Sequence, residues 1–472
     1  MKHLFMSFLL IAAGVLMGLD VAAQQQRRGA VKTNIPYSDA RPILDVLQAN
    51  LLPAELQGKT PTQLEMIWPD WVSRRDAMIR TRAEQGDEDS VIHFLLFGTM
   101  FTQAPLATDG ELAAFVARPA EAPSLLRARI EDFVAAVASP DANERLQFVR
   151  QVITRKGIDP TTEAGRDKMR RYLEERTESF ASTAVQSQKV LLSDPGAESL
   201  NRRTLFRDRG LTFNTSIFVN LAIEQTLEAI KAKGLLEPGT VRNVAIVGPG
   251  LEFTDKQDGY DFYPPQTIQP FAVIDSLIRL GLSKPLELQV TAFDLSPGII
   301  RHLEAARARA RAGGPYMVVL PRNLDRRWMP ALVTAWERFG DRIGEETKAV
   351  EGPPSAGRLE IRSVLVRPSV VLSTIPRDLN IVLQRYEPTS TTDQFDLIIA
   401  TNILIYYDVF EQSLAVANIA TMLRPGGFFL TNDRIFELPS TPIGEVGYTD
   451  VNYMEVPGIG EAGDRIVWYR RQ

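Results

Sequence analysis

The chain has 472 residues and a net charge of -5, and it contains no cysteine and three histidines. The absence of cysteine excludes disulfide bonds, a thiol nucleophile, thiolate zinc sites and iron–sulfur clusters. The mild negative charge gives no electrostatic reason to expect a nucleic-acid partner. Any chemistry must therefore rely on carboxylates, amides, hydroxyls, arginines and backbone groups.

Residues 1–23 are typical of a secretory signal peptide. Lys2 provides the positive charge, residues 4–19 form an apolar run, and small residues at 21–23 precede a cleavage point. This run is shorter than the ~20 residues of a usual membrane span, which favours cleavage over an uncleaved anchor. No later stretch of the sequence is long and apolar enough to cross a membrane. We therefore expect a periplasmic or secreted protein, with a short polar linker at residues 24–37.

The next part of the chain, residues 38–200, has the periodicity of helices. Apolar residues recur at three- and four-residue spacing over 125–137 and over 146–153, with a break at Ser139-Pro140. Residues 91–101 are apolar on nearly every side, which predicts a buried helix with His93 as a packing residue. These patterns predict an all-helical N-terminal domain, and they assign it no chemistry.

The pattern changes to alternating strands and helices over residues 201–472. We predict a helix at 216–233, a strand at 241–247 that enters Gly248-Pro249-Gly250, a helix at 268–280, a strand at 288–293 that ends on Asp294, and a helix at 297–312. This is the βαβ order of an open parallel sheet. Later we predict strands at 395–400 and 428–431, a helix at 409–423, a turn at 424–427 and a last strand at the sheet edge at 466–469.

Ligands of such sheets bind outside the carboxyl ends of the strands. Gly248 and Gly250 would let backbone approach a ligand closely, and Asp294 is placed to accept hydrogen bonds from two ribose hydroxyls. A dinucleotide would favour G-x-G-x-x-G, but this turn reads GPGLEF, and Glu252 would repel a pyrophosphate. A carboxylate suits the cationic methionine end of S-adenosylmethionine, so the pattern disfavours NAD.

Four motifs resemble those of the CheR-type (chemotaxis receptor) methyltransferases, which are class I S-adenosylmethionine-dependent methyltransferases. FDLIIATNILIYYD (395–408) and LRPGGFFLTND (423–433) are similar to that family's F-D-x-I-x-x-x-N-x-x-I-Y-F-D and L-x-P-G-G motifs. TLFRD (204–208) resembles T-x-F-F-R-D, one residue shorter, and QPFA (269–272) resembles E-P-Y-S. The resemblance implies a Rossmann-like methyltransferase sheet with helices on both faces, preceded by an all-helical domain.

The resemblance also implies a set of site residues. Around S-adenosyl-L-methionine it implies Gly248, Gly250 and Glu252 at the methionine part, Asp294 at the ribose, and Leu379 with Asn380 at the adenine. Asn402 and Tyr406 would line the methyl-transfer site, and Arg207 would hold a carboxylate of cofactor or substrate. No metal is expected. Structural roles also stay open: Asn402 as a tie at the strand end, Tyr406 as a core aromatic, and Arg207 in a surface ion pair with Asp208.

The chain departs from the family pattern at several places. Thr401 stands where the family usually has Arg, an extra loop occupies residues 253–266, and an irregular insert occupies residues 322–356. Both insertions could cover the site, which leaves the acceptor open. A carboxylate acceptor needs no general base, whereas a hydroxyl or amine would need one, with Asp433, Glu252 and Tyr406 as candidates.

The expected function is therefore methyl transfer from S-adenosylmethionine to an unidentified carboxylate, hydroxyl or amine. An exported protein would meet little of this cofactor, which is made in the cytoplasm. The alternative is an exported, catalytically inactive methyltransferase-like binding or structural protein.

Overall fold

The computed structural model describes residues 31–105, 114, 124–193, 211, 217–254, 258–352, 357–432, 434–456 and 460–472. Within residues 124–193, side chains are described only as far as residue 182. The predicted signal peptide and the predicted domain boundary at residue 200 lie outside these ranges. Within them, no helix is both long and apolar enough to cross a membrane.

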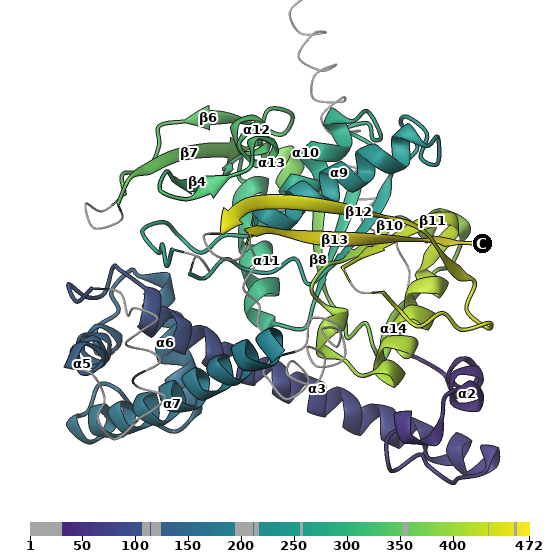
Figure 1. Cartoon of the computed structure of the whole chain (residues 1–472), viewed down its shortest axis with the longest axis horizontal. Coiled ribbons are helices and arrows are strands. Elements are labelled where there is room, and N and C mark those ends of the chain that lie inside the picture. Colours follow the sequence, from purple (N-terminus) through teal and green to yellow (C-terminus); the bar gives the residue numbers. More distant parts are fainter. Residues whose placement is uncertain are drawn as a thin grey trace, which may run out of the picture.

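The centre of the molecule is an eight-stranded sheet in the order β5-β12-β13-β11-β10-β2-β3-β8 (Figure 1). Five strands run parallel: β2 (Asn243–Val247), β3 (Gln289–Asp294), β8 (Thr374–Asp378), β10 (Phe395–Ala400) and β11 (Leu423–Thr431). Along the sequence, β3 and then β8 are added on one side of β2, and afterwards β10 and then β11 are added on its other side. The strand order therefore reverses between β2 and β10, as in doubly wound Rossmann-like sheets.

The antiparallel end of the sheet corrects two predictions. β13 (Gly460–Arg471) pairs with β11 on one side and with β12 (Ile443–Val456) on the other, and β12 also pairs with the short β5 (Arg327–Trp328). The strand predicted at the edge, 466–469, is therefore internal, because the long β12–β13 hairpin folds its first strand to the outside. The turn predicted at 424–427 lies within β11, where the register against β10 is irregular.

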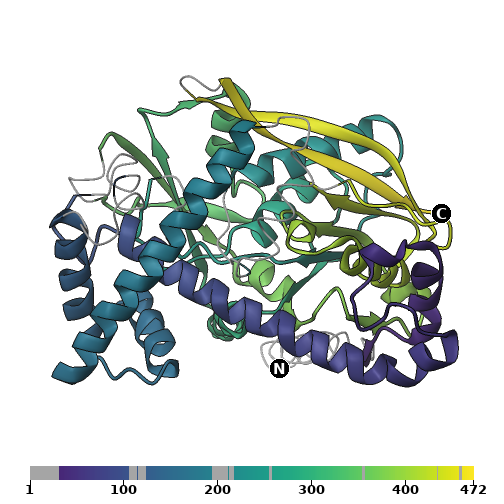
Figure 2. The same ribbon diagram turned by 60° about the horizontal axis from the view of Figure 1, so that its bottom comes forward.

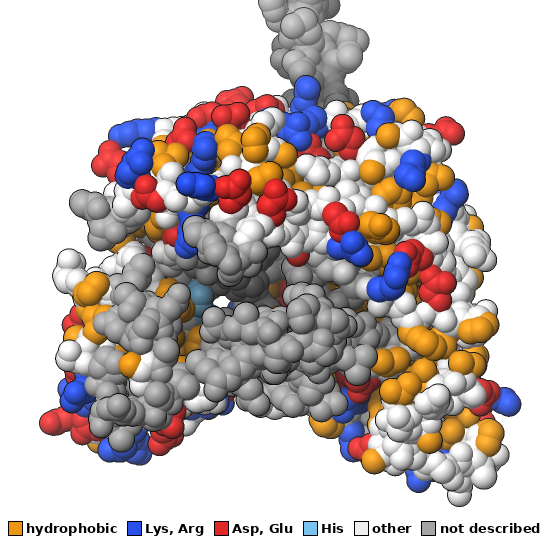
Figure 3. Space-filling model, in the orientation of Figure 1, with side chains coloured by type: hydrophobic (Ala, Val, Ile, Leu, Met, Phe, Trp, Pro, Cys, Tyr) orange, Lys and Arg blue, Asp and Glu red, His pale blue; other side chains and the backbone are white. Residues whose placement is uncertain are grey.

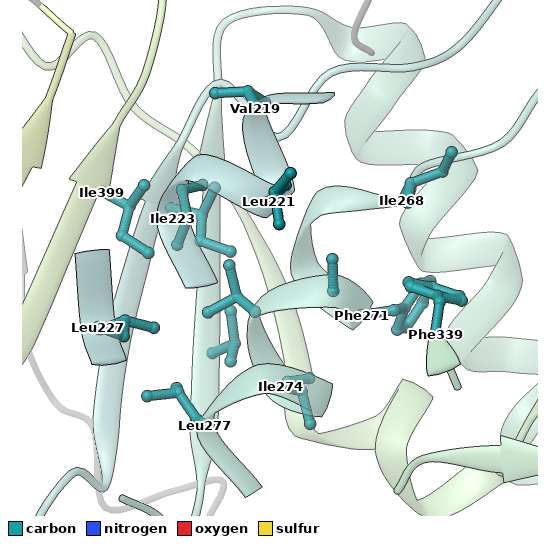
Figure 4. Close-up of a cluster of buried hydrophobic side chains, with 14 of the residues drawn as sticks. Val219, Leu221, Ile223, Leu227, Ile268, Phe271, Ile274, Leu277, Phe339 and Ile399 are labelled. Carbon is teal, nitrogen blue, oxygen red and sulfur yellow. The ribbon is translucent and has the colours of Figure 1, made fainter. Parts of the chain in front are cut away.

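Both faces of the sheet are covered, as the consecutive buried residues of β2, β3 and β10 require. Val244 and Ile246 of β2 face a core shared with α9 (Phe218–Ala232) and α10 (Gln269–Arg279), part of which is drawn in Figure 4. Ala245 and Val247 face a second core shared with α14 (Val409–Met422). α11 (Pro297–Arg311) packs on the α10 side. This confirms the expected α/β fold class, with helices on both faces.

The N-terminal part is helical, as predicted. It contains α2 (Tyr37–Val46), the 3-10 turn η1 (Ala49–Leu51), α3 (Pro61–Phe97), α5 (Ser124–Ala138), α6 (Glu144–Arg155) and α7 (Glu163–Ser193). In Figures 1 and 2, α3 extends along the molecule from α2 to the group α5–α7. α3 ends at Phe97 and not at 101, because Gly98 leaves the helical conformation.

The first half of α3 packs on the Rossmann-like sheet domain and the second half on the other helices. Trp71 meets Phe410 of α14 with ring centroids 5.7 Å apart, and Arg75 donates to Glu411 at 2.8 Å. β1 (Val31–Asn34), inside the predicted linker, pairs with β9 (Gln384–Glu387). Both contacts join the N-terminal segment to the far part of the sequence.

The insert predicted to be irregular, 322–356, forms regular elements within its described residues, 322–352. It contributes β5, α12 (Pro330–Arg338) and β6 (Gly344–Thr347), and β6 joins a second sheet, β4-β7-β6, with β4 (Tyr316–Asn323) and β7 (Leu359–Val366). The remaining elements are α13 (Pro368–Ser373), η4 (Thr391–Asp393) and η5 (Leu404–Tyr406). Trp336 of α12 is buried in the main core, so the insert is part of the folded domain.

Candidate active site at the carboxyl edge of the sheet

The carboxyl ends of β2, β3 and β8 bring several of the predicted site residues together. The N–H of Gly248 donates to the carbonyl of Phe293 at 2.8 Å, one residue before Asp294. The N–H of Leu379 donates to the carbonyl of Asp294 at 3.2 Å. Gly248, Asp294 and Leu379 therefore lie side by side at the ends of three neighbouring strands.

The glycine turn has the backbone conformation that the sequence suggested. Gly248 and Gly250 have φ angles of 68° and 72°, in the left-handed region that favours glycine. A Cβ at Gly248 would overlap with Cδ1 of Ile403, which follows β10. The packing of Ile403 is therefore already a sufficient reason for glycine at 248.

Asp294 has unusual electrostatics. Its side chain is buried, and one carboxyl oxygen accepts the backbone N–H of Ser296 at 2.8 Å. Burial raises the pKa of Asp294 to about 7, although the backbone N–H groups of Ser296 and Leu295 act in the opposite direction. In the described part of the chain no lysine or arginine forms an ion pair with it. A ligand that donates hydrogen bonds here would meet a carboxyl group with little competing solvation.

Glu252 and Asn380 are engaged inside the protein. Glu252 is buried and accepts from the hydroxyl of Tyr263, and its backbone N–H donates to Gln266 at 2.7 Å. Asn380 is also buried, and its Nδ2 donates to Asp76 of α3 at 2.7 Å. These contacts define structural roles for both side chains, which the motifs did not indicate, because Tyr263 lies outside the glycine turn and Asp76 is far from Asn380 in the sequence.

Asn402 and Tyr406 follow β10 at the same edge. Asn402 is exposed and has a φ of 58°, and its backbone N–H donates to Oδ1 of Asn432 at 3.0 Å. Tyr406 is partly buried, and its carbonyl accepts from Arg82 of α3 at 2.8 Å. Arg207 and Asp433 lie outside the described residues.

Sequence reasoning missed Asn432, which follows β11. Its Nδ2 is buried and has no hydrogen-bond partner among the described residues. An unsatisfied buried donor is costly unless a ligand or water meets it. The only sequence signal was its place in the FFLTND segment, after the strand next to Asn402.

Two departures from the family motifs contact each other. The Nε2 of Gln269, at the E-P-Y-S position of Glu, donates to Oγ1 of Thr401, at the position of Arg, at 2.9 Å. Both side chains are buried. A neutral hydrogen bond thus joins the start of α10 to the end of β10, and neither buried side chain carries a charge.

The loop over residues 253–266 is held by the helical region. Arg145 of α6 donates to the carbonyls of Phe253, Asp261 and Tyr263, the second at 3.1 Å. Asp261 accepts the backbone N–H of Thr99 at 3.0 Å, just after α3. The described residues of this loop, 253, 254 and 258–266, are therefore anchored to the helical region. Across the described ranges, no group of three or more acidic or histidine side chains is arranged to hold a metal ion.

Comparison with known proteins adds structural similarity only. No family model and no curated protein sequence matches the chain. A TehB-like S-adenosylmethionine-dependent methyltransferase from Corynebacterium glutamicum matches at 10% identity and a TM-score of 0.23, over 54% of this chain and 98% of that one. Magnesium protoporphyrin IX methyltransferase from Synechocystis, with bound S-adenosylmethionine, matches at 9% and 0.23, over 61% and 97%.

The glycopeptide N-methyltransferase MtfA, complexed with S-adenosylmethionine, matches at 11% identity and a TM-score of 0.20, over 52% of this chain and 77% of that one. These scores carry no argument about the site, so the fold class rests on the strand order of this chain. The chain has a Rossmann-like α/β fold with an N-terminal helical region, and these three similar solved structures are methyltransferases.

Proposed function

We propose that the protein is an S-adenosylmethionine-dependent methyltransferase whose site lies at the carboxyl edge of β3, β2 and β10. One observation carries the proposal: a left-handed glycine turn, a buried acid and Asn402 meet where the order of a parallel sheet reverses. That is the position at which open α/β sheets bind ligands.

The residues at this edge fit the cofactor in part. Asp294 would accept the two ribose hydroxyls, and the turn at Gly248 and Gly250 would lie along the methionine part. The side chain of Leu379 is buried in the second core, so Leu379, like Glu252 and Asn380 with their internal hydrogen bonds, would shape the site from inside the fold. The bound cofactor would supply an activated methyl group on a sulfonium.

The protein's own task would be alignment and exclusion of water. Asn402 and Tyr406 would orient the acceptor, with the amide of Asn432 as a further donor. Since Glu252 is hydrogen-bonded inside the fold, Tyr406 is the described candidate for a general base, and an acceptor that is already a carboxylate would need none. Protein glutamate, the acceptor in the CheR-type resemblance, is one case of that class.

The alternative is an exported, catalytically inactive binding or structural protein. The internal hydrogen bonds of Glu252 and Asn380 favour it, because two side chains implied as cofactor contacts are used for folding. A periplasmic or secreted location, proposed from residues 1–23, favours it too. A fusion of residues 1–40 to alkaline phosphatase would test export.

Calorimetry of the purified protein with S-adenosylmethionine and S-adenosylhomocysteine tests the proposed function. We expect saturable binding of both, and at least a tenfold loss of affinity in Asp294→Ala. Glu304→Ala, an exposed acid on α11, is the matched control and should bind as wild type does. No binding of either ligand at millimolar concentration would contradict the proposal, and binding without turnover of any acceptor tested would favour the alternative.

A further inference from the structure

A cavity of about 740 Å³ lies between α11 and the helical region. Its α11 wall includes Arg301, His302, Ala305 and Arg309, which share one face of the helix. Phe148 of α6 and Leu251, next to Gly250, line other sides. Figure 3 shows the molecule hollowed between its upper part and the helices at the lower left. We call this space the α11 cavity, and its volume is that of a small-molecule site.

A hydrogen-bond chain determines which nitrogen of His302 carries the proton. The hydroxyl oxygen of Tyr316 accepts the backbone N–H of Thr267 at 2.8 Å, and it lies 2.8 Å from Nε2 of His302. Among the described residues Tyr316 has no other acceptor for its proton, so we assign the hydroxyl as the donor to Nε2. This assignment makes His302 the neutral tautomer with its proton on Nδ1. Burial also favours the neutral form, since it lowers the pKa of His302 to about 4.

In the described part of the chain, Nδ1–H of His302 has no hydrogen-bond partner. Nδ1 is also not fully shielded from solvent. It is therefore accessible at a residue that lines the cavity. Arg309 lies on the same face of α11, two turns further on. Its charge is close enough to lower the pKa of His302, after the larger effect of burial.

The charge of the lining favours an anion. Within the described ranges neither Arg301 nor Arg309 has a carboxylate within ion-pair distance. Of the two acids that line the cavity, Asp87 pairs with Arg155 at 2.7 Å, and Glu144 is in the first turn of α6, where the helix dipole stabilises its charge. Arg309 and Arg301 therefore share the lining with one acid that has no paired cation, Glu144, and Arg301 also acts on the charge of Asp87.

We propose that the α11 cavity binds a small organic anion whose carboxylate or sulfonate lies between Nδ1–H of His302 and the guanidinium of Arg309. Its apolar body would pack against Phe148 and Leu251. A charge-assisted hydrogen bond to arginine and a second donor at fixed geometry are the usual means of holding such a group. This inference does not rest on the proposed methyl transfer, although the cavity borders the proposed cofactor site at Leu251 and Ser296.

Fluorescence titration with anilinonaphthalene sulfonate, a sulfonate on an apolar body, tests the site. We expect saturable binding to one site, competition by naphthoate, and weak or no competition by its neutral analogue naphthalene methanol. Arg309→Ala should weaken binding of the dye at least tenfold. Arg311→Ala, which removes an exposed arginine of the same helix outside the cavity lining, should leave it unchanged.

A second variant, Ala305→Trp, fills the cavity from an exposed helix position and should also abolish binding. Absence of saturable binding by wild type would overturn the proposal. Unchanged affinity in Arg309→Ala, or an equal loss in Arg311→Ala, would also overturn it, because the dye would then be bound elsewhere. None of these results depends on S-adenosylmethionine, so they separate this site from the proposed function.

Discussion

Asp294→Asn is the most informative single change, because it separates the folding role of this carboxyl from its ligand role. Asparagine keeps an oxygen that can accept the N–H of Ser296, which the aspartate accepts at 2.8 Å, and it has nearly the same shape. It cannot ionise. The substitution thus removes the buried negative charge and leaves the hydrogen bond at the end of β3 in place.

The sign and size of the effect follow from the pKa of Asp294. In the folded protein burial raises this pKa to about 7, whereas in the unfolded chain it is about 4. Between these values the folded state binds more protons than the unfolded state, so stability falls as pH rises. A shift of about 3 units at ~1.4 kcal/mol per unit destabilises the wild type by at most ~4 kcal/mol above pH 7. Asp294→Asn lacks this penalty.

Urea denaturation of both proteins at about pH 5 and about pH 8.5 measures the effect. We expect the advantage of Asp294→Asn over wild type to grow by about 2 to 3 kcal/mol between the two pH values, while calorimetry shows weaker binding of S-adenosylmethionine. Other titrating groups, such as His302, are common to both proteins and cancel in the difference. A stability difference independent of pH would refute the raised pKa and with it our account of this carboxyl.

Three further predictions concern packing, each measured by urea denaturation. Gly248→Ala should lower the free energy of unfolding by about 1 to 3 kcal/mol. Adding Ile403→Val to that variant removes the overlapping Cδ1 and should recover part of the loss, whereas no recovery would mean that the φ angle alone causes it. Arg145→Met should lower the free energy of unfolding by about 3 kcal/mol, because it leaves carbonyls of the loop without a donor. It should also make residues 253–266 sensitive to proteolysis, and an unchanged cleavage pattern would contradict the role of Arg145 as the anchor of that loop. Trp71→Ala should lower the free energy of unfolding by about 3 to 5 kcal/mol, and Trp71→Phe should lower it less, because a ring stays beside Phe410. Equal losses in the two variants would mean that the ring contact with Phe410 is unimportant.

Local sequence pattern determined the order of β2, α10, β3, α11, β10, α14 and β11, and part of the site, but it did not indicate β8 or β12. The short apolar run over residues 241–247 and the helical pattern over 297–312 match β2 and α11, because both patterns depend on near neighbours in the sequence. The glycine turn and Asp294 could be placed at the carboxyl edge for the same reason, since each directly follows a strand. The assignment of Asn402 and Tyr406 to methyl transfer remains a prediction.

The tertiary structure alone decided how distant segments meet. It placed β13 between β11 and β12, joined the first half of α3 to α14, and paired Gln269 with Thr401. It also used Glu252 and Asn380 for internal hydrogen bonds, and it aligned His302 and Arg309 along a cavity. Most of these contacts join side chains that are far apart in the sequence; His302 and Arg309 lie on one helix, and their place beside a cavity depends on what packs opposite α11. A sequence pattern reports which residues can be buried, but the partner of a buried group is set only when the layers pack.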